Sequence, residues 1–453
     1  MGLTRSFHLT DLTRKERRPG RVIAIAAPGN RMDQFVFNED GDILIEKVER
    51  VTDDAPDFVK DAWRKAKQDR IREFKKKQDL SYDEKLERQA KIAWSYYEQL
   101  QGMKLNAHVS VGGLDSITLY IWLLSIGIDV PAISVTGIED ASIQRVHKAL
   151  GITKVAPYKS KIQVLREFGF PVISKKIAGR IDMLQNATPE NATVRHAIIT
   201  GECGKQGHYA KNSRMKLPKK WLTRFGGWDP DEGQPYSHPD FKVSKDCCYW
   251  VKEKPCDDWA REHNSKPYLG LMAIEGGQRE EALVDHGCNY FGDSTISSCP
   301  FAIFLRDDVL HLAQEMDAWY RNHIDLFEAK FHKQPYGKYP DGRHKIYEPV
   351  ESIIPLIYGE IRQYEDGTRY TTKAQRTGCS MCGFGIHLEK RPHRFDRLRQ
   401  ANPKEWEFLM YRCCTDSEGK PYGWGKVLDY IGVGWEDIPP EQMTITDWME
   451  EIE

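Results

Sequence analysis

The chain has 453 residues, of which 40% are hydrophobic and 11% aromatic, enough for a sizeable core and two to three domains at ~150 residues each. Its 66 basic and 67 acidic side chains nearly cancel, which excludes a globally basic nucleic-acid coat and an acidic solvating tail. No apolar run approaches the ~18 residues of a membrane span. The N-terminal segment lacks the apolar core of a signal peptide, so a cytoplasmic protein is expected.

The N-terminal region, residues 1–101, is predicted to be an accessory region of short strands followed by helix. A hairpin signal, Glu39-Asp40-Gly41-Asp42, separates the last two of three β-prone runs. These runs cover residues 22–26, 34–38 and 42–48. Residues 56–101 are rich in charged side chains with sparse apolar points, which predicts a solvated helix. A basic arm that touches nucleic acid is the alternative.

Strand and helix patterns alternate from residue 102 onward, which predicts an α/β domain over residues 102–312 with a parallel sheet and right-handed crossovers. The predicted strands cover 107–111, 130–135 and 153–157, and the predicted helices cover 116–126, 141–150 and 162–168. Residues 205–245 are expected to be loop-like. A long helix is predicted over 307–330, and residues 313–453 are predicted to form a mostly helical C-terminal region.

A glycine-rich segment, Ser110-Val111-Gly112-Gly113-Leu114-Asp115-Ser116, joins the first predicted strand of this domain to its first helix. Such a turn directs backbone N–H groups at one point, where the helix N-terminus adds partial positive charge. Glycines let a phosphate approach the backbone closely. The alternative is a tight strand–helix turn in which Asp115 and Ser116 cap the helix.

Ten cysteines in a chain without a secretion signal indicate reduced thiols, metal ligands or catalytic groups. Two groupings stand out, the adjacent pair Cys247-Cys248 and the CxxC sequence Cys379-Ser-Met-Cys382. Four thiolates suit either tetrahedral zinc or a [4Fe–4S] cluster, and spacing alone does not separate the two. The others are expected to be buried apolar thiols, one of which could carry sulfur. They are Cys203, Cys256, Cys288, Cys299, Cys413 and Cys414.

Residues 175–224 contain eleven Lys or Arg against three Asp or Glu, with His196, His208, Tyr209 and Trp221 interleaved. This mixture can bind phosphates by charge and bases by stacking, which makes a nucleic-acid acceptor or partner one interpretation. A solvated loop is the other. A second basic cluster, 390–399, follows the CxxC sequence.

The glycine-rich segment resembles the PP-loop of the ATP pyrophosphatase superfamily, usually written SGGxDS, with Val111 at the first serine. Later segments resemble the phosphoadenosine-phosphosulfate (PAPS) reductase family in the same order, over about residues 105–430. They are Val135-Thr136-Gly137-Ile138-Glu139, Phe168-Gly169-Phe170-Pro171-Val172-Ile173-Ser174-Lys175, Gly270-Leu271-Met272-Ala273-Ile274-Glu275-Gly276-Gly277-Gln278-Arg279 and Pro300 to Val309. Val135 and Gly276 depart from the family pattern.

This resemblance implies a parallel-sheet PP-loop domain that binds an adenine nucleotide, either ATP or a sulfonucleotide (APS or PAPS), with Mg²⁺ as an expected companion. The residues implied for nucleotide binding are Ser110, Gly112, Gly113, Asp115, Ser116, Thr136, Gly137 and Glu275. The residues implied for catalysis are Asp115, Lys175 and Arg279. Lys175 and Arg279 would neutralise charge that develops on the phosphates.

The cysteine arrangement is similar to the cluster ligands of adenylylsulfate (APS) reductases and of the sulfur-transfer enzymes of DNA phosphorothioation. The resemblance therefore implies a [4Fe–4S] cluster on Cys247, Cys248, Cys379 and Cys382. The 130 residues between the two pairs imply an insertion, expected over 306–375.

The reductases carry a catalytic cysteine in a C-terminal Glu-Cys-Gly-x-His segment, and only a partial echo, Glu202-Cys203-Gly204 with His208, occurs in this sequence. We therefore expect ATP-dependent adenylation and sulfur transfer to an acceptor, with a sulfur-donor protein as a partner. One alternative is a sulfonucleotide reductase that forms sulfite with an internal cysteine. Another is a non-catalytic nucleotide- or nucleic-acid-binding regulator.

Overall fold

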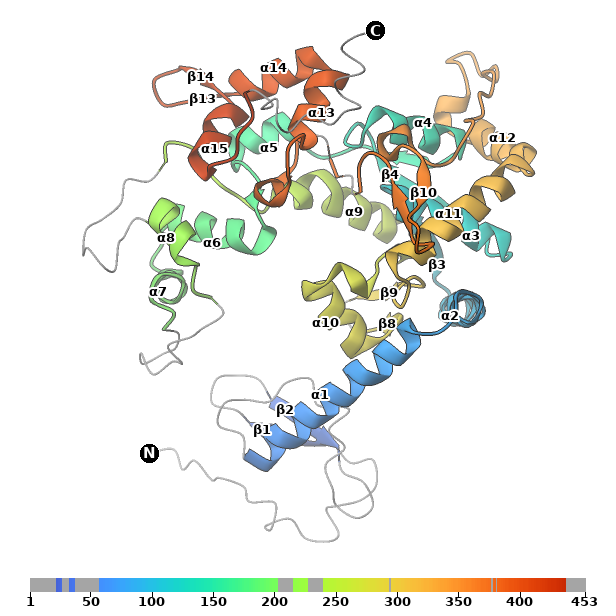
Figure 1. Ribbon diagram of the computed structural model, residues 1–453, viewed down its shortest axis with the longest axis horizontal. Coiled ribbons are helices and arrows are strands. Elements are labelled where there is room, and N and C mark those ends of the chain that lie inside the picture. The colour runs from blue at the N-terminus through green and yellow to red at the C-terminus, as the bar shows by residue number, and fades with distance from the viewer. Residues whose placement is uncertain are drawn as a thin grey trace. The chain divides into compact units, whose positions relative to one another are not determined.

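The computed structural model describes residues 22–26, 32–36, 57–202, 215–226, 239–292, 295–375, 378–379 and 381–436. The chain divides into two compact units, neither of which is continuous in sequence (Figure 1). Unit 1 consists of Met1–Tyr96 and Gly270–Asp308, and unit 2 of Tyr97–Leu269 and Val309–Glu453. Among the described helices, none is both long and apolar enough to cross a membrane.

Unit 1 contains the N-terminal strands, two long helices and a second hairpin. Strand β1 (Val22–Ala26) pairs antiparallel with β2 (Met32–Val36), close to two of the three predicted runs, whereas the run at 42–48 lies outside the described residues. The other elements are α1 (Asp57–Gln78), α2 (Tyr82–Gly102), which continues into unit 2, α10 (Gly277–His286), β8 (Asn289–Phe291) and β9 (Ile296–Ser298).

The helix predicted over 56–101 is in fact two helices, because Ser81 begins a new one. The Ser81 backbone N–H and hydroxyl both donate to the Glu84 carboxylate, at 2.9 and 2.6 Å, and the Glu84 N–H donates back to the Ser81 hydroxyl. This reciprocal capping box satisfies N–H groups that a continuous helix would bond to carbonyls of the preceding turn. Farther along α2, a buried ion pair joins Lys85 to Asp308 at 2.7 Å.

Unit 2 is built on a parallel sheet, which confirms the α/β class. The strands lie in the order β5 (Thr153–Val155), β4 (Ala132–Val135), β3 (Asn106–Ser110) and β7 (Ser265–Tyr268), and every neighbouring pair is parallel. The connecting helices are α3 (Leu114–Ser125), α4 (Ala141–Ala149) and α5 (Lys161–Glu167), as predicted. Helix α9 (Lys254–Glu262) packs across β4, β5 and β7.

The single helix predicted over 307–330 is wrong, since the chain forms α11 (Arg306–Arg321) and α12 (Ile324–Lys333) instead. His323 explains the break. Its ring stacks on Trp319 with centroids 3.9 Å apart, and its Nδ1 bonds the Trp319 carbonyl at 2.8 Å. The His323 side chain thereby competes for the Trp319 carbonyl, which a continuing helix would use as a backbone acceptor. The backbone at this point forms i→i+3 hydrogen bonds instead.

The rest of unit 2 is a group of short helices and two small hairpins. The region predicted to be loop-like over 205–245 contains a helix, α8 (Lys219–Phe225). The remaining helices are α6 (Lys175–Gln185), α7 (Ala192–Thr200), α13 (Arg394–Ala401), α14 (Pro403–Tyr411) and α15 (Trp424–Ile431). The hairpins are β10 (Ile361–Gln363) with β11 (Arg369–Thr371), and β13 (Cys414–Thr415) with β14 (Pro421–Tyr422).

A short strand, β6 (Val172–Ile173), joins distant parts of the sequence. It pairs in parallel with β12 (Gly383–Phe384), which directly follows the CxxC sequence. Just before it, Phe170 forms a parallel bridge with Val243, four residues ahead of Cys247. Both cysteine pairs are therefore brought to the same strand, and the 130 residues between them do not separate them in space.

The pairing of β12 with β6 depends on the close approach of the Gly383 backbone to Trp424 and Pro171. A Cβ on Gly383 would lie 2.6 Å from the Trp424 ring and 2.7 Å from the Pro171 carbonyl oxygen. The Trp424 ring also meets the fully buried Phe170 ring edge-on, with centroids 4.9 Å apart. Strand β12 can thus lie against β6 and Trp424 only because residue 383 has no side chain.

We predict that Gly383→Ala lowers the thermal unfolding midpoint of the protein by several degrees, because overpacking a tight contact costs about 1–3 kcal/mol. Circular dichroism during a thermal ramp measures this midpoint. Gly102→Ala is the control, because no described atom lies within 4 Å of its Cβ position, and its midpoint should stay equal or rise slightly. Equal midpoints for Gly383→Ala and the native chain would contradict the close packing of β12.

Candidate functional site

The glycine-rich segment lies where β3 ends and α3 begins, as the sequence predicts. The Gly112 N–H donates to the Ser116 hydroxyl at 2.8 Å, and that hydroxyl donates to the Gly113 carbonyl at 3.0 Å. The N-cap residue of α3 is Gly113, and no side chain caps it, so the alternative in which Asp115 and Ser116 cap the helix does not hold. The Ser116 hydroxyl instead braces the loop itself, and Asp115 lies in the first turn of the helix.

A buried histidine, which sequence reasoning missed, holds the same loop from α4. His147 Nε2 bonds the Gly112 carbonyl at 2.8 Å, and Lys154 Nζ lies 3.1 Å from His147 Nδ1. Because the lysine donates to Nδ1, the ring carries its proton on Nε2 and donates it to the carbonyl. Burial lowers the pKa of His147 to about 3 and that of Lys154 to about 8. A neutral imidazole therefore fixes the orientation of the Gly112 peptide.

A carboxylate and an ammonium group lie beside the loop. A Cβ on Gly112 would lie 3.6 Å from Glu139 Oε1, and the Glu139 side chain is only 3% exposed. Lys252 Nζ donates to this oxygen. Burial alone lowers the pKa of Lys252, but the neighbouring Cys379 and Glu139 outweigh burial and raise this pKa above its ordinary value. Lys252 is consequently a charged group placed between the loop and a thiol.

All four predicted cluster ligands line one small cavity. Besides these thiols, its walls are mostly apolar, formed by side chains that include Leu165, Val251 and Leu409. The residues Cys247, Cys248, Cys379 and Cys382 reach it from two segments, one before α9 and one before β12. The assignment of these four cysteines to one site rests on this convergence.

Local backbone structure positions each cysteine pair. Cys248 precedes a π-helical turn, Tyr249–Glu253, which is a feature often found at functional sites and which also carries Lys252. In the CxxC turn, the Cys382 N–H donates to the Cys379 carbonyl at 3.1 Å. The Arg394 guanidinium, from the basic cluster 390–399, donates to the Cys382 carbonyl at 3.1 Å.

The four thiols form a donor set that either tetrahedral zinc or a [4Fe–4S] cluster uses. Burial raises the pKa of Cys247 and Cys379 above the ordinary value and that of Cys248 to about 11. Thiolates at this site therefore need the positive charge of a bound metal. Within the described part of the chain, no three His, Cys, Asp or Glu side chains converge on one metal-ion position.

The remaining predicted site residues lie at three places. Thr136 and Gly137 follow β4 and Ser110 ends β3, so these three lie near one edge of the parallel sheet. Lys175 begins α6 and pairs with Glu253, and its charge acts on Cys248, so it lies beside the cysteine site. Glu275 and Arg279 belong to unit 1, where they pair with each other.

Much of the basic stretch 175–224 is used within the fold. Arg180 is buried and donates to the Lys216 carbonyl at 3.3 Å, and Arg224 donates to the Tyr430 carbonyl at 2.6 Å. Arg195 bonds Asn191 at 2.7 Å. Lys205, Lys211, Arg214, His208, Tyr209 and Cys203 lie outside the described residues. A nucleic-acid role for the stretch stays a prediction.

The other described cysteines are buried or half-buried, as predicted for apolar thiols. Cys299, Cys413 and Cys414 are buried, and the sulfurs of Cys413 and Cys414 lie 4.0 Å apart. Burial raises the pKa of Cys256 to about 11 and that of Cys299 to about 12. Cys256 packs in the same apolar group as Cys247 and Cys379, yet it does not line their cavity.

No protein-family model and no curated protein matches this chain.

We predict that His147 makes the protein less stable in acid. The unfolded chain binds a proton at the ordinary histidine pKa of 6.5, whereas the folded chain resists it until about pH 3. The stability from neutral His147 is thus complete above pH 6.5 and declines as the pH falls toward 3. Urea titrations over this range measure the slope of the unfolding free energy against pH. His147→Gln should reduce this slope by the amount that corresponds to about one bound proton. An identical dependence in the variant and the native chain would show that His147 is not buried neutral.

Proposed function

We propose that the protein is an ATP-dependent sulfurtransferase of the PP-loop type, in which unit 2 combines a nucleotide-binding loop with a [4Fe–4S] site. The observation that carries this proposal is the position of Lys252. Its ammonium group contacts Glu139, which borders Gly112 of the loop, and Lys252 lies in the π-helical turn that follows Cys248. The two functional elements predicted separately are therefore neighbours linked by one side chain.

The loop has the features that phosphate binding requires. The N-terminus of α3 directs partial positive charge at the loop, and Lys154 and Lys252 supply full charges beside it. The carboxylates of Asp115 and Glu139 are oxygen donors of the kind that Mg²⁺ accepts. His147 and Ser116 brace the loop on either side of Gly112, which keeps the loop rigid when phosphates bind.

The proposed reaction has two steps. An acceptor oxygen attacks the α-phosphorus of ATP, the bond between that phosphorus and the bridging oxygen breaks, and pyrophosphate leaves with the electron pair. A donor then supplies sulfur at the oxidation level of hydrosulfide. This sulfur attacks the acceptor carbon that carries the adenylated oxygen, the bond between that carbon and oxygen breaks, and AMP leaves with the electron pair. In the first step, Lys154 and Lys252 stabilise charge that develops on the phosphates.

The four cysteines would hold the cluster, which when bound supplies a centre for electron transfer or for binding sulfur. The chain's own contribution is to keep this centre dry and close to the loop. Apolar side chains such as Leu165 and Leu409 exclude water from the cavity. Lys252 pairs with Glu139 and would also balance negative charge on a thiolate at Cys379.

A sulfonucleotide reductase would need a nucleophilic cysteine near the nucleotide. Among the described cysteines outside the four-cysteine site, the pKa of Cys256 is raised to about 11, and Cys414, whose pKa Cys413 lowers, is buried. These properties do not favour a reactive thiolate. We therefore favour ATP-dependent activation of an acceptor over reduction of a sulfonucleotide. The non-catalytic regulator remains the third candidate.

We predict about four irons and four sulfides per chain after anaerobic purification. Cys379→Ser should lose most of this iron, because one of the four thiolates is gone. Cys256→Ser is the matched control and should keep it, because Cys256 packs nearby without lining the cavity. Stoichiometric zinc in the native chain, or equal iron in both variants, would contradict the cluster assignment.

We predict that the cluster-loaded protein binds ATP and exchanges labelled pyrophosphate into ATP in the presence of acceptor. Ser116→Ala removes the hydroxyl that braces the loop, and Lys252→Gln removes the positive charge beside Glu139. Each should weaken ATP binding by about tenfold in equilibrium dialysis. Lys404→Gln, on the exposed start of α14, should not change it. Sulfite release from labelled APS or PAPS would identify a reductase instead. ATP binding that is unchanged in both loop variants would overturn the proposal.

A further inference from the structure

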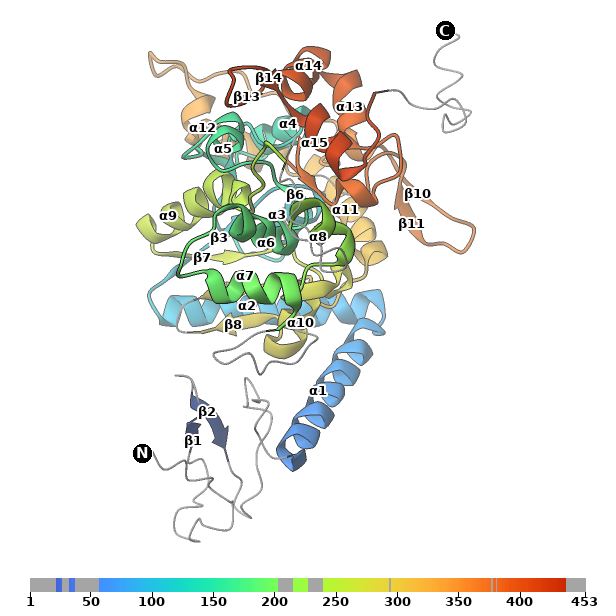
Figure 2. The same cartoon turned by 90° about the vertical axis from the view of Figure 1, so that its left-hand side faces the viewer.

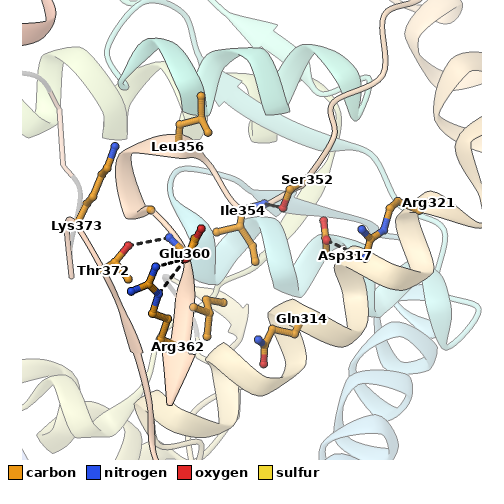
Figure 3. Close-up of a pocket in the computed structure, with 12 residues that line it drawn as sticks. Gln314, Asp317, Arg321, Ser352, Ile354, Leu356, Glu360, Arg362, Thr372 and Lys373 are labelled. Atoms are coloured by element: carbon orange, nitrogen blue, oxygen red, sulfur yellow. Dashed lines mark hydrogen bonds and ion pairs between the residues drawn. The ribbon is translucent and has the colours of Figure 1, made fainter. Parts of the chain in front are cut away.

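A cavity of about 700 Å³ lies in unit 2 between α11 and the base of the β10–β11 hairpin (Figure 3). Its lining residues belong to the segment 306–375, which was predicted as an insertion. None of them belongs to the glycine loop or lines the cysteine cavity. Its size lies within the range of small-molecule sites, about 300–1,000 Å³. Its lining surface is mainly apolar, with side chains that include Ile354, Leu356 and Ile361, and it also carries charged side chains from α11 and from the hairpin.

The charged groups around the cavity leave an excess of one positive charge. Arg321 pairs with Asp317 at 3.2 Å, and Arg362 pairs with Glu360 at 2.7 Å. Lys373 is the third cation of the lining, and no described carboxylate forms an ion pair with it. Both arginine side chains are more than half exposed, so their guanidinium groups remain accessible to a ligand as well. This cavity is therefore suited to an anionic group.

An aromatic surface continues from the cavity along the same face of the hairpin. Arg362 lies directly opposite Tyr370 in the antiparallel register, and Tyr364 is two residues beyond Arg362. Residues at these positions share one face of a hairpin. The rings of Tyr364 and Tyr370 stack with centroids 4.2 Å apart, and Tyr364 is 56% exposed. Figure 2 shows that this hairpin projects from the body of unit 2.

The segment that lines the cavity is also anchored to the start of α3. The Tyr358 hydroxyl accepts the Leu114 N–H at 3.2 Å, directly after the glycine loop. Leu356 and Gly359, on either side of Tyr358, both line the cavity.

We propose that this cavity and the Tyr364–Tyr370 face bind a nucleotide unit, with its base stacked on Tyr364 and its phosphate at Arg362 and Lys373. A base binds by stacking on an aromatic ring, and a phosphate binds by pairing with cationic side chains. The unit can come from a free mononucleotide or from a nucleic-acid strand. The assignment is separate from the nucleotide at the glycine loop and does not depend on it.

The test uses two probes, AMP and a short fluorescein-labelled oligothymidylate, with the full chain. Calorimetry measures AMP binding and fluorescence anisotropy measures oligonucleotide binding. Tyr364→Ala and the double variant Arg362→Gln/Lys373→Gln should each weaken binding by about tenfold or more. Tyr364→Phe keeps the stacked ring and should bind as the native chain does. Lys404→Gln, on the exposed start of α14, should likewise leave this binding unchanged.

Each outcome decides the proposal. Oligonucleotide binding that falls with added salt and is lost in the cavity variants identifies a strand as the source. AMP binding alone, with the same losses, identifies a free mononucleotide. The substituted side chains are on the surface, and equal thermal midpoints will show that the variants fold. If neither probe binds, or if binding is the same in the cavity variants and the native chain, the proposal is overturned.

Discussion

The parallel pairing of β6 with β12, together with the Phe170–Val243 bridge just before it, is the constraint on which the cysteine site depends. Two residues of strand are too few to be stable alone. Their stability comes from the packing of Phe170 against Trp424 and from the absence of a side chain at Gly383. The site is thus held by an aromatic core behind it, and the thiols themselves add no covalent link.

Lys252 gives this site its connection to the glycine loop. A buried carboxylate such as Glu139 is costly unless it is paired, and a positive charge near thiolates is stabilising. One ammonium group meets both requirements, so any change in charge at the thiols also alters the electrostatics beside Gly112. Lys252 thus contacts Glu139 beside the loop and lies in the π-helical turn that follows Cys248.

Local sequence patterns predicted the alternating strands and helices of unit 2 well, because hydrophobic periodicity and turn residues are local properties. They also identified the four thiols that share a cavity. They did not predict His147 or Lys252, whose roles come from contacts across 35 and 113 residues of sequence. An isolated histidine or lysine on a helix carries no signal of such a partner. The break between α11 and α12 was missed because a side chain, His323, competes for a backbone carbonyl.

Trp424 has a consequence for how the protein is made. The cavity of the four thiols is closed behind β12 by a residue that the ribosome adds some 40 positions after Cys382. Domains generally fold as units once their residues have emerged. During synthesis, the first cysteine pair is consequently exposed to solvent and oxidants while more than a third of the chain is still missing. Closure of the cavity of the four thiols is therefore a late event, which follows the synthesis of both cysteine pairs.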